Sequence, residues 1–185
     1  MPIRWSVLFV MLFGHLWLVL LSASAATEFP ASFPGNWSTF GRAVLKSSGN
    51  SIVIANGTAF SDPALNDYEF SFRARAPQEA GQVQLWAAVR LKNRDCRYVV
   101  GLRGGPEKQL SLARYAPDGQ SKFLGWVPLE FTPECATWYT LRIAVHDHRF
   151  HVYLNDEKLP RINIEDTDAN WMTGGVGLGG GWLPA

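Results

Sequence analysis

The segment of residues 82–90 carries side chains whose types and spacing suit ligand binding. Its sequence alternates, so Gln84, Trp86 and Arg90 fall on one face of an extended strand. An aromatic ring packs on the apolar C–H face of a pyranose, and amide and guanidinium groups hydrogen-bond its hydroxyls. This chemistry predicts a stacking platform for a sugar. The alternative interpretation is that Trp86 fills a second, covered face of the sheet.

Side chains of the same kind recur on other alternating segments. Arg97 and Arg103 share one face of their segment, and His151 and Tyr153 share a face of another. The predicted sugar-binding set is Arg73, Gln84, Trp86, Arg90, Arg97, Arg103, His151 and Tyr153. The excess of arginine on these faces suits acidic sugars.

Alternation also predicts the elements that position these residues. In residues 67–77, Tyr68, Phe70 and Phe72 share one face, opposite charged residues, and residues 140–154 repeat the pattern around a short turn. The sequence predicts about ten to twelve short strands and no convincing helix. With roughly 160 residues after the first segment, we expect an antiparallel two-sheet sandwich rather than a barrel.

Three motifs resemble laminin G-like and concanavalin A-like domains. Residues 138–159 resemble the pattern in which a Trp opens a strand, a short turn follows, and a second strand ends in an Asn/Asp-containing turn. Residues 174–179 resemble the glycine-rich strand near the end of these domains, and residues 67–77 resemble the strand before their first long hairpin. The similarity covers roughly residues 35–182. It implies an all-β, antiparallel two-sheet jelly-roll sandwich.

The resemblance also implies glycan binding. Domains of this kind after a signal peptide resemble accessory modules of secreted glycoside hydrolases. We therefore expect a non-catalytic, lectin-like carbohydrate-binding module of a glycan-degrading protein. The alternatives are a glycoside hydrolase on the same fold, recognised by the product it releases, and a structural or protein-binding laminin G-like domain.

Catalytic carboxylates are the feature that separates the first two functions. Retaining glycosidases of this fold carry Glu-x-Asp-x-Glu on one strand, where alternation holds the nucleophile and the acid/base on one face. The predicted strands do not carry this pattern, so the sequence assigns no catalytic residue and favours a non-enzymatic role. Another catalytic arrangement stays open.

A calcium site is a second candidate. Asp166, Asp168 and Asn170 place oxygen donors at alternate positions, and calcium takes six to eight such ligands from flexible turns. Laminin G-like relatives often bind calcium at the rim of the sandwich. The alternative is a cluster of Asx turns with no cofactor.

The N-terminal segment predicts export. Residues 5–21 are almost wholly apolar, follow Arg4, and precede a small-x-small pair, Ala23 and Ala25. This layout predicts a signal peptide over residues 1–25, a sandwich domain over residues 26–185, and a secreted or periplasmic location. The alternative is an uncleaved membrane anchor. Relatives usually continue past the glycine-rich strand, so we expect a chain cut short before its last strand, with a catalytic domain downstream.

Cysteine usage and charge complete the expectations. An oxidising compartment permits a disulfide between Cys96 and Cys135, and two free, buried thiols are the alternative. The formal net charge of +1 falls to zero when Arg4 is removed with the signal peptide. This balance gives no reason to expect nucleic acid or, after cleavage, a membrane as a partner. The expected partner is a polysaccharide or glycan.

Overall fold

The computed structural model describes residues 27–30, 38–48, 51–167 and 171–180. The predicted signal peptide over residues 1–25 lies outside them. Within these ranges, no helix has the length and apolar character that a bilayer-spanning helix needs.

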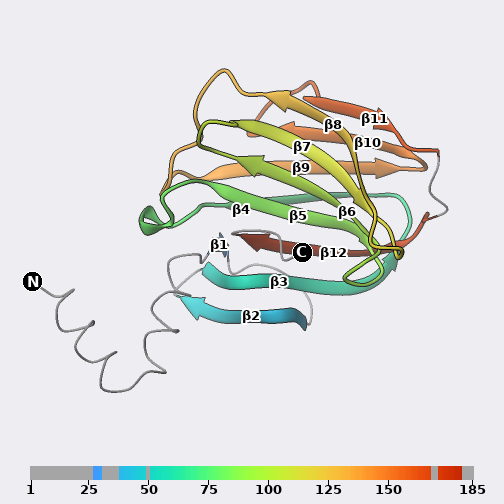
Figure 1. The fold of residues 1–185 in the computed structure, drawn as a ribbon, viewed down its shortest axis with the longest axis horizontal. Helices are drawn as coiled ribbons and strands as arrows, with labels where there is room; N and C mark the ends of the chain where they lie inside the picture. Colours follow the sequence, from blue (N-terminus) through green and yellow to red (C-terminus); the bar gives the residue numbers. More distant parts are fainter. Residues whose placement is uncertain (1–26, 31–37, 49–50, 168–170, 181–185) are drawn as a thin grey trace, which may run out of the picture.

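Two antiparallel sheets form the described part of the chain (Figure 1). The larger sheet has the order β1-β3-β12-β5-β6-β7-β8, with β2 also paired to β3. Its strands are β1 (Thr27–Pro30), β2 (Ser38–Ser48), β3 (Ser51–Leu65), β5 (Gln84–Leu91), β6 (Arg97–Arg103), β7 (Gln109–Tyr115), β8 (Ser121–Pro128) and β12 (Gly174–Gly180). The smaller sheet has the order β11-β10-β9-β4, from β4 (Tyr68–Ala74), β9 (Tyr139–His146), β10 (Arg149–Leu154) and β11 (Ile162–Glu165). The predicted all-β, antiparallel two-sheet sandwich is confirmed.

The β9–β10 hairpin shows how the sequence sets this architecture. Its buried apolar pairs are Leu141 with Leu154, Ile143 with Val152, and Val145 with Phe150. They share one face because the side-chain period of a strand is two. Asp147 makes the turn with a φ of 48°, a left-handed conformation that Asp adopts more readily than most residues.

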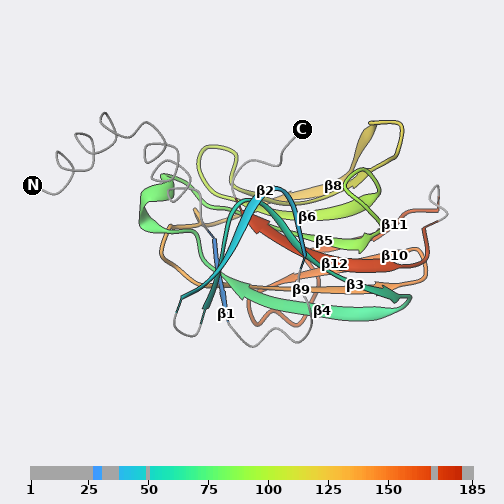
Figure 2. The same cartoon turned by 90° about the horizontal axis from the view of Figure 1, so that it is seen from below.

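The hydrophobic core lies between the two sheets. In Figure 2, β5, β6 and β8 lie in one layer and β4, β9 and β10 in another. The larger sheet contributes alternate residues of its central strands to this core, including Leu85, Ala87, Val89, Tyr98, Val100, Leu102, Leu110 and Leu112. The other residues of these strands therefore point away from the four-stranded sheet. We call that side of the larger sheet the outer face.

A polar network closes one end of the core. The buried Asp166 carboxylate accepts hydrogen bonds from the Arg114 guanidinium at 2.7 and 2.9 Å and from the Tyr98 hydroxyl at 3.1 Å. Burial, with the nearby Asp166 charge, raises the pKa of Tyr98 well above its usual value, so its hydroxyl stays protonated and donates. The Tyr98 ring packs on Phe150 with centroids 4.4 Å apart. This network ties β6 and β7 to the segment after β11.

Arg90 departs from its predicted face. Its φ is 48°, and β12 changes register against the end of β5 beside it, so the alternation of β5 is interrupted there. Arg90 is 1% exposed, its Nη1 donates to the carbonyl oxygen of Trp171 at 3.1 Å, and its guanidinium lies 5.6 Å from the Phe150 ring centroid. The prediction that Arg90 shares an outward face with Gln84 and Trp86 is wrong, because the left-handed backbone turns its side chain into the sandwich.

The two cysteines are unpaired thiols near opposite ends of β6. Cys96 directly precedes this strand. Gly104, directly after the strand, lies against the backbone of Pro133, two residues from Cys135. The seven residues of β6 span roughly 20 Å, whereas a disulfide needs Cα atoms about 4.4–6.8 Å apart. The predicted disulfide is therefore wrong, and burial raises the pKa of both thiols.

Candidate functional site

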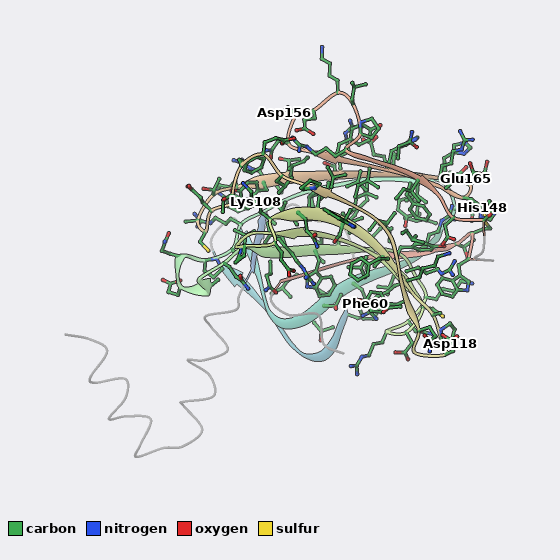
Figure 3. The ribbon with its side chains drawn as sticks, turned by 45° about the horizontal axis from the view of Figure 1, so that its top comes forward. Phe60, Lys108, Asp118, His148, Asp156 and Glu165 are labelled. Atoms are coloured by element: carbon green, nitrogen blue, oxygen red, sulfur yellow. The ribbon has the colours of Figure 1, made fainter. Side chains whose placement is uncertain are left out.

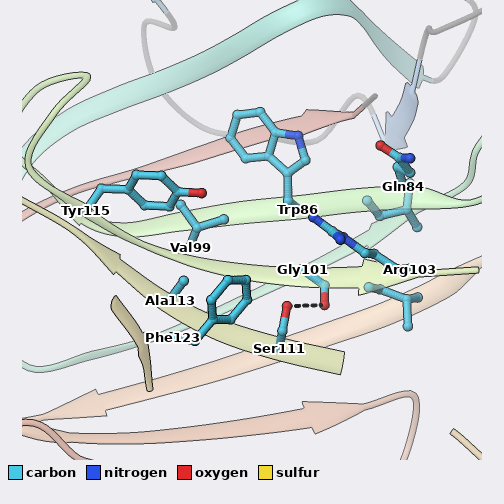
Figure 4. A pocket seen from close by; sticks show the side chains of 11 residues that line it. Gln84, Trp86, Val99, Gly101, Arg103, Ser111, Ala113, Tyr115 and Phe123 are labelled. Atoms are coloured by element: carbon cyan, nitrogen blue, oxygen red, sulfur yellow. Dashed lines mark hydrogen bonds between the residues drawn. The ribbon is translucent and has the colours of Figure 1, made fainter. Parts of the chain in front are cut away.

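A hollow lies on the outer face along β6 and its neighbours β5 and β7 (Figure 4). It is a small hollow of about 40 Å³ and is open to solvent. Its polar and aromatic lining residues are Gln84, Trp86, Arg103, Ser111, Tyr115 and Phe123. They come from four strands because outward positions of neighbouring antiparallel strands lie side by side.

Trp86 lies in this hollow over glycines. Its cross-strand partners are Gly179 on β12 and Gly101 on β6. A Cβ atom at Gly179 would stand 2.6 Å from Cε2 of the indole, so the ring occupies the space that a side chain there would need. Trp86 is 3% exposed, and its indole Nε1 has no hydrogen-bond partner in the part of the chain that the structure describes. Most of the ring is therefore covered, as the alternative interpretation of Trp86 expected, although the residue still lines the hollow.

Exposed aromatic rings stand on β8 beside the hollow. Phe123 is 62% exposed and Trp126 is 60% exposed. They pair with Ala113 and Ser111 of β7, which are outward positions, so both rings lie on the outer face. A register shift between β7 and β8 lets these two residues, three positions apart, share that face. The edge of the larger sheet thus offers two flat apolar surfaces for stacking.

Hydrogen-bond donors lie at both ends of the hollow. Gln84 and Arg103 are cross-strand partners at one end, where the Arg103 side chain extends along the sheet toward Trp86 (Figure 4). At the other end the Arg97 guanidinium lies 4.6 Å from the Tyr115 ring centroid. Burial lowers the pKa of Arg97, yet a guanidinium keeps its charge in proteins. The face therefore combines apolar rings with cationic and neutral donors.

The structure brings together half of the predicted sugar-binding set. Gln84, Trp86 and Arg103 line the hollow, and Arg97 lies beside it on Tyr115. Arg90 points into the sandwich.

The remaining three predicted residues lie on the four-stranded sheet. Arg73, His151 and Tyr153 alternate with its core residues and face away from the core. Arg73 stacks on Trp138 at 5.2 Å, and Tyr153 lies under Arg142 at 3.5 Å. These residues belong to a different surface from the hollow.

Four residues of the outer face are missing from the sequence-based set, namely Ser111, Tyr115, Phe123 and Trp126. Alternation along β7 could have placed Ser111 and Tyr115 beside the outward residues of β6. Phe123 and Trp126 differ in parity, so simple alternation puts them on opposite faces. Their common face depends on the β7–β8 register shift, which carries no sequence signal that we recognise.

The predicted calcium ligands are only partly within the described residues. Asp168 and Asn170 lie outside them. Asp166 is buried, and its carboxylate is bound by Arg114 and Tyr98. Its charge is therefore already balanced by a guanidinium, which does not suit an open cation site, and calcium binding stays a prediction.

No protein-family model and no curated protein matches this sequence. Similarity therefore comes from solved structures.

Three solved structures show the same architecture at low sequence identity. The carbohydrate-binding module CBM66 from Bacillus subtilis has a TM-score of 0.55 and 13% identity, over 77% of this chain and 87% of its own. Sheep galectin-11, in a complex with glycerol, has a TM-score of 0.51 and 12% identity, over 65% of this chain and 88% of its own. A glycoside hydrolase family 16 endo-glucanase from Bacteroides ovatus has a TM-score of 0.50 and 7% identity, over 82% of this chain and 83% of its own. These likenesses confirm the predicted concanavalin A-like jelly-roll fold.

Proposed function

We propose that this chain is a secreted carbohydrate-binding module that holds a glycan on the outer face of its larger sheet without cleaving it. The observation that carries the proposal is the hollow, where the exposed Phe123 ring lies beside the donors Gln84 and Arg103. Aromatic rings beside planar donors match the two chemical aspects of a sugar, an apolar C–H face and polar hydroxyls. Secretion follows from the predicted signal peptide.

Two further observations support this function. The fold is shared with a protein named as a carbohydrate-binding module and with a galectin, although fold alone does not determine function. The described residues that line the hollow include no Asp or Glu, whereas glycoside hydrolysis usually needs a pair of carboxylates. We therefore favour binding over cleavage.

Replacing Phe123 with alanine tests the proposal. The ring is mostly exposed, so its loss should change the free energy of unfolding by no more than about 0.5 kcal/mol. It should weaken glycan binding about tenfold, because the stacking surface at the edge of the hollow is lost. The measurement is pull-down of the purified protein on a panel of insoluble and immobilised polysaccharides, followed by titration of the polymer that binds.

Leu159→Ala is the matched control, because Leu159 is 80% exposed and lies outside the hollow. It should leave glycan binding unchanged. Equal losses in both variants would contradict a site at the hollow. Sugar released into the supernatant would move the function to a glycoside hydrolase, and sensitivity to EDTA would support the predicted calcium.

A further inference from the structure

Five arginines away from the hollow have carboxylate partners. The ion pairs join Arg90 to Asp67, Arg114 to Asp166, Arg142 to Glu69, Arg149 to Glu165, and Arg161 to Glu130 and Glu157. No carboxylate among the described residues lies within ion-pairing distance of Arg97 or Arg103, and the same is true of Arg73, which stacks on Trp138 on the other sheet. Arg97 and Arg103 are on the outer face, one at each end of the hollow.

The sequence of the central strands explains why these charges are not balanced. Strands β5, β6, β7 and β8 contain no Asp or Glu. The acids in the turns between these strands, Asp95, Glu107 and Asp118, are exposed. Figure 3 shows Asp118 at the tip of its turn, beyond the sheet. The face that carries the hollow is therefore locally cationic in a chain of nearly zero net charge.

Buried donors on the same face also lack acceptors. Trp86 Nε1 and Arg97 Nε are inaccessible to solvent, and neither has a hydrogen-bond partner among the described residues. Trp86 is 3% exposed and Arg97 is 7% exposed. Because both atoms are shielded from solvent, a ligand oxygen reaches them only if these side chains move, so they do not by themselves select a ligand. The guanidinium charges of Arg97 and Arg103 are therefore the feature of this face that suits a ligand with negatively charged oxygen atoms.

We infer that the glycan held at the hollow is acidic, and that Arg103 binds its anionic group. This inference rests on the proposed carbohydrate-binding function. The planar guanidinium of Arg103 can donate two parallel hydrogen bonds to a carboxylate or sulfate, while aromatic rings pack on the sugar. Arg97 lies six positions along β6, roughly 20 Å away, so the two cations match separate acidic units of an oligosaccharide.

Matched acidic and neutral ligands test the inference. We would titrate the purified protein with oligogalacturonate and with the same oligomer after reduction of its carboxyl groups. Dextran sulfate and unmodified dextran form a second pair, which separates sulfate from carboxylate as the source of the charge. At least one acidic ligand should bind about tenfold more tightly than its neutral counterpart, and added salt should weaken that binding.

Arg103→Gln should remove this preference while the protein stays folded. Arg73→Gln is the matched control, because Arg73 is an exposed arginine on the four-stranded sheet, and it should keep the preference. Equal affinity for acidic and neutral partners, or binding to neutral glycans alone, would overturn the acidic ligand and leave the carbohydrate-binding function intact. An equal loss in both variants would also overturn it, since the effect would then be unspecific charge attraction. Failure of the folded protein to bind any glycan, including the polysaccharide panel, would overturn both proposals.

Discussion

Replacing Asp166 with alanine is expected to lower the free energy of unfolding by about 3–5 kcal/mol. The change removes the carboxylate that binds Arg114 and the buried Tyr98 hydroxyl, so a largely buried guanidinium loses its counter-charge. Urea denaturation monitored by tryptophan fluorescence measures the loss. For a domain of this size, the midpoint temperature of thermal unfolding should fall by about 2–4 °C for each kcal/mol of lost stability.

Asp156→Ala is the control, because Asp156 is an exposed residue in the turn after β10 and should have little effect. A loss of less than about 1 kcal/mol in Asp166→Ala would show that the network contributes little to stability. The prediction would also fail if addition of calcium changed the stability of the wild-type protein and not that of Asp166→Ala, because the carboxylate would then be a cation ligand.

Gly179→Ala is expected to destabilise the fold by about 1–3 kcal/mol and to weaken glycan binding as well. A methyl group at this position collides with the indole of Trp86, which is rigid and buried. The ring must shift within the hollow, so two measurements, urea denaturation and titration with the bound polysaccharide, should change together.

Gly125→Ala provides a matched comparison in the same sheet. A methyl group there also collides with a side chain, but the atom in its way is the terminal Cδ1 of Ile164, which can rotate aside. Its cost should stay below about 1 kcal/mol, with binding unchanged. Equal costs in the two variants would show that the rigidity of Trp86 does not control this part of the face.

Alternation is a clear signal in the four-stranded sheet, because buried and solvent-facing residues alternate along β4, β9 and β10. The alternating segment of residues 67–77 contains β4, and the pattern predicted over residues 140–154 corresponds to β9 and β10. The short 3-10 helix Gln78–Ala80 was not predicted, because three residues carry no period.

The site was less predictable than the fold. The sequence identified Gln84, Trp86 and Arg103, whose outward positions follow from alternation alone. It misplaced Arg90, because the left-handed backbone at this residue turns its side chain to the other face of the sheet. It also missed Phe123 and Trp126, which share a face only because the β7–β8 register shifts. The disulfide prediction failed because the sequence does not show that Cys96 and Cys135 lie near opposite ends of β6.

The position of β12 has a consequence for how the chain acquires its structure. This strand lies between β3 and β5, yet a long stretch from Leu91 to Gly174 separates it from β5 in the sequence. During synthesis, β3 and β5 emerge long before the strand that joins them, and their exposed backbone edges can pair with other chains in the meantime. Because the joining contact closes so long a loop, we expect refolding in milliseconds to seconds rather than microseconds. We also expect recovery from denaturant to fall as protein concentration rises.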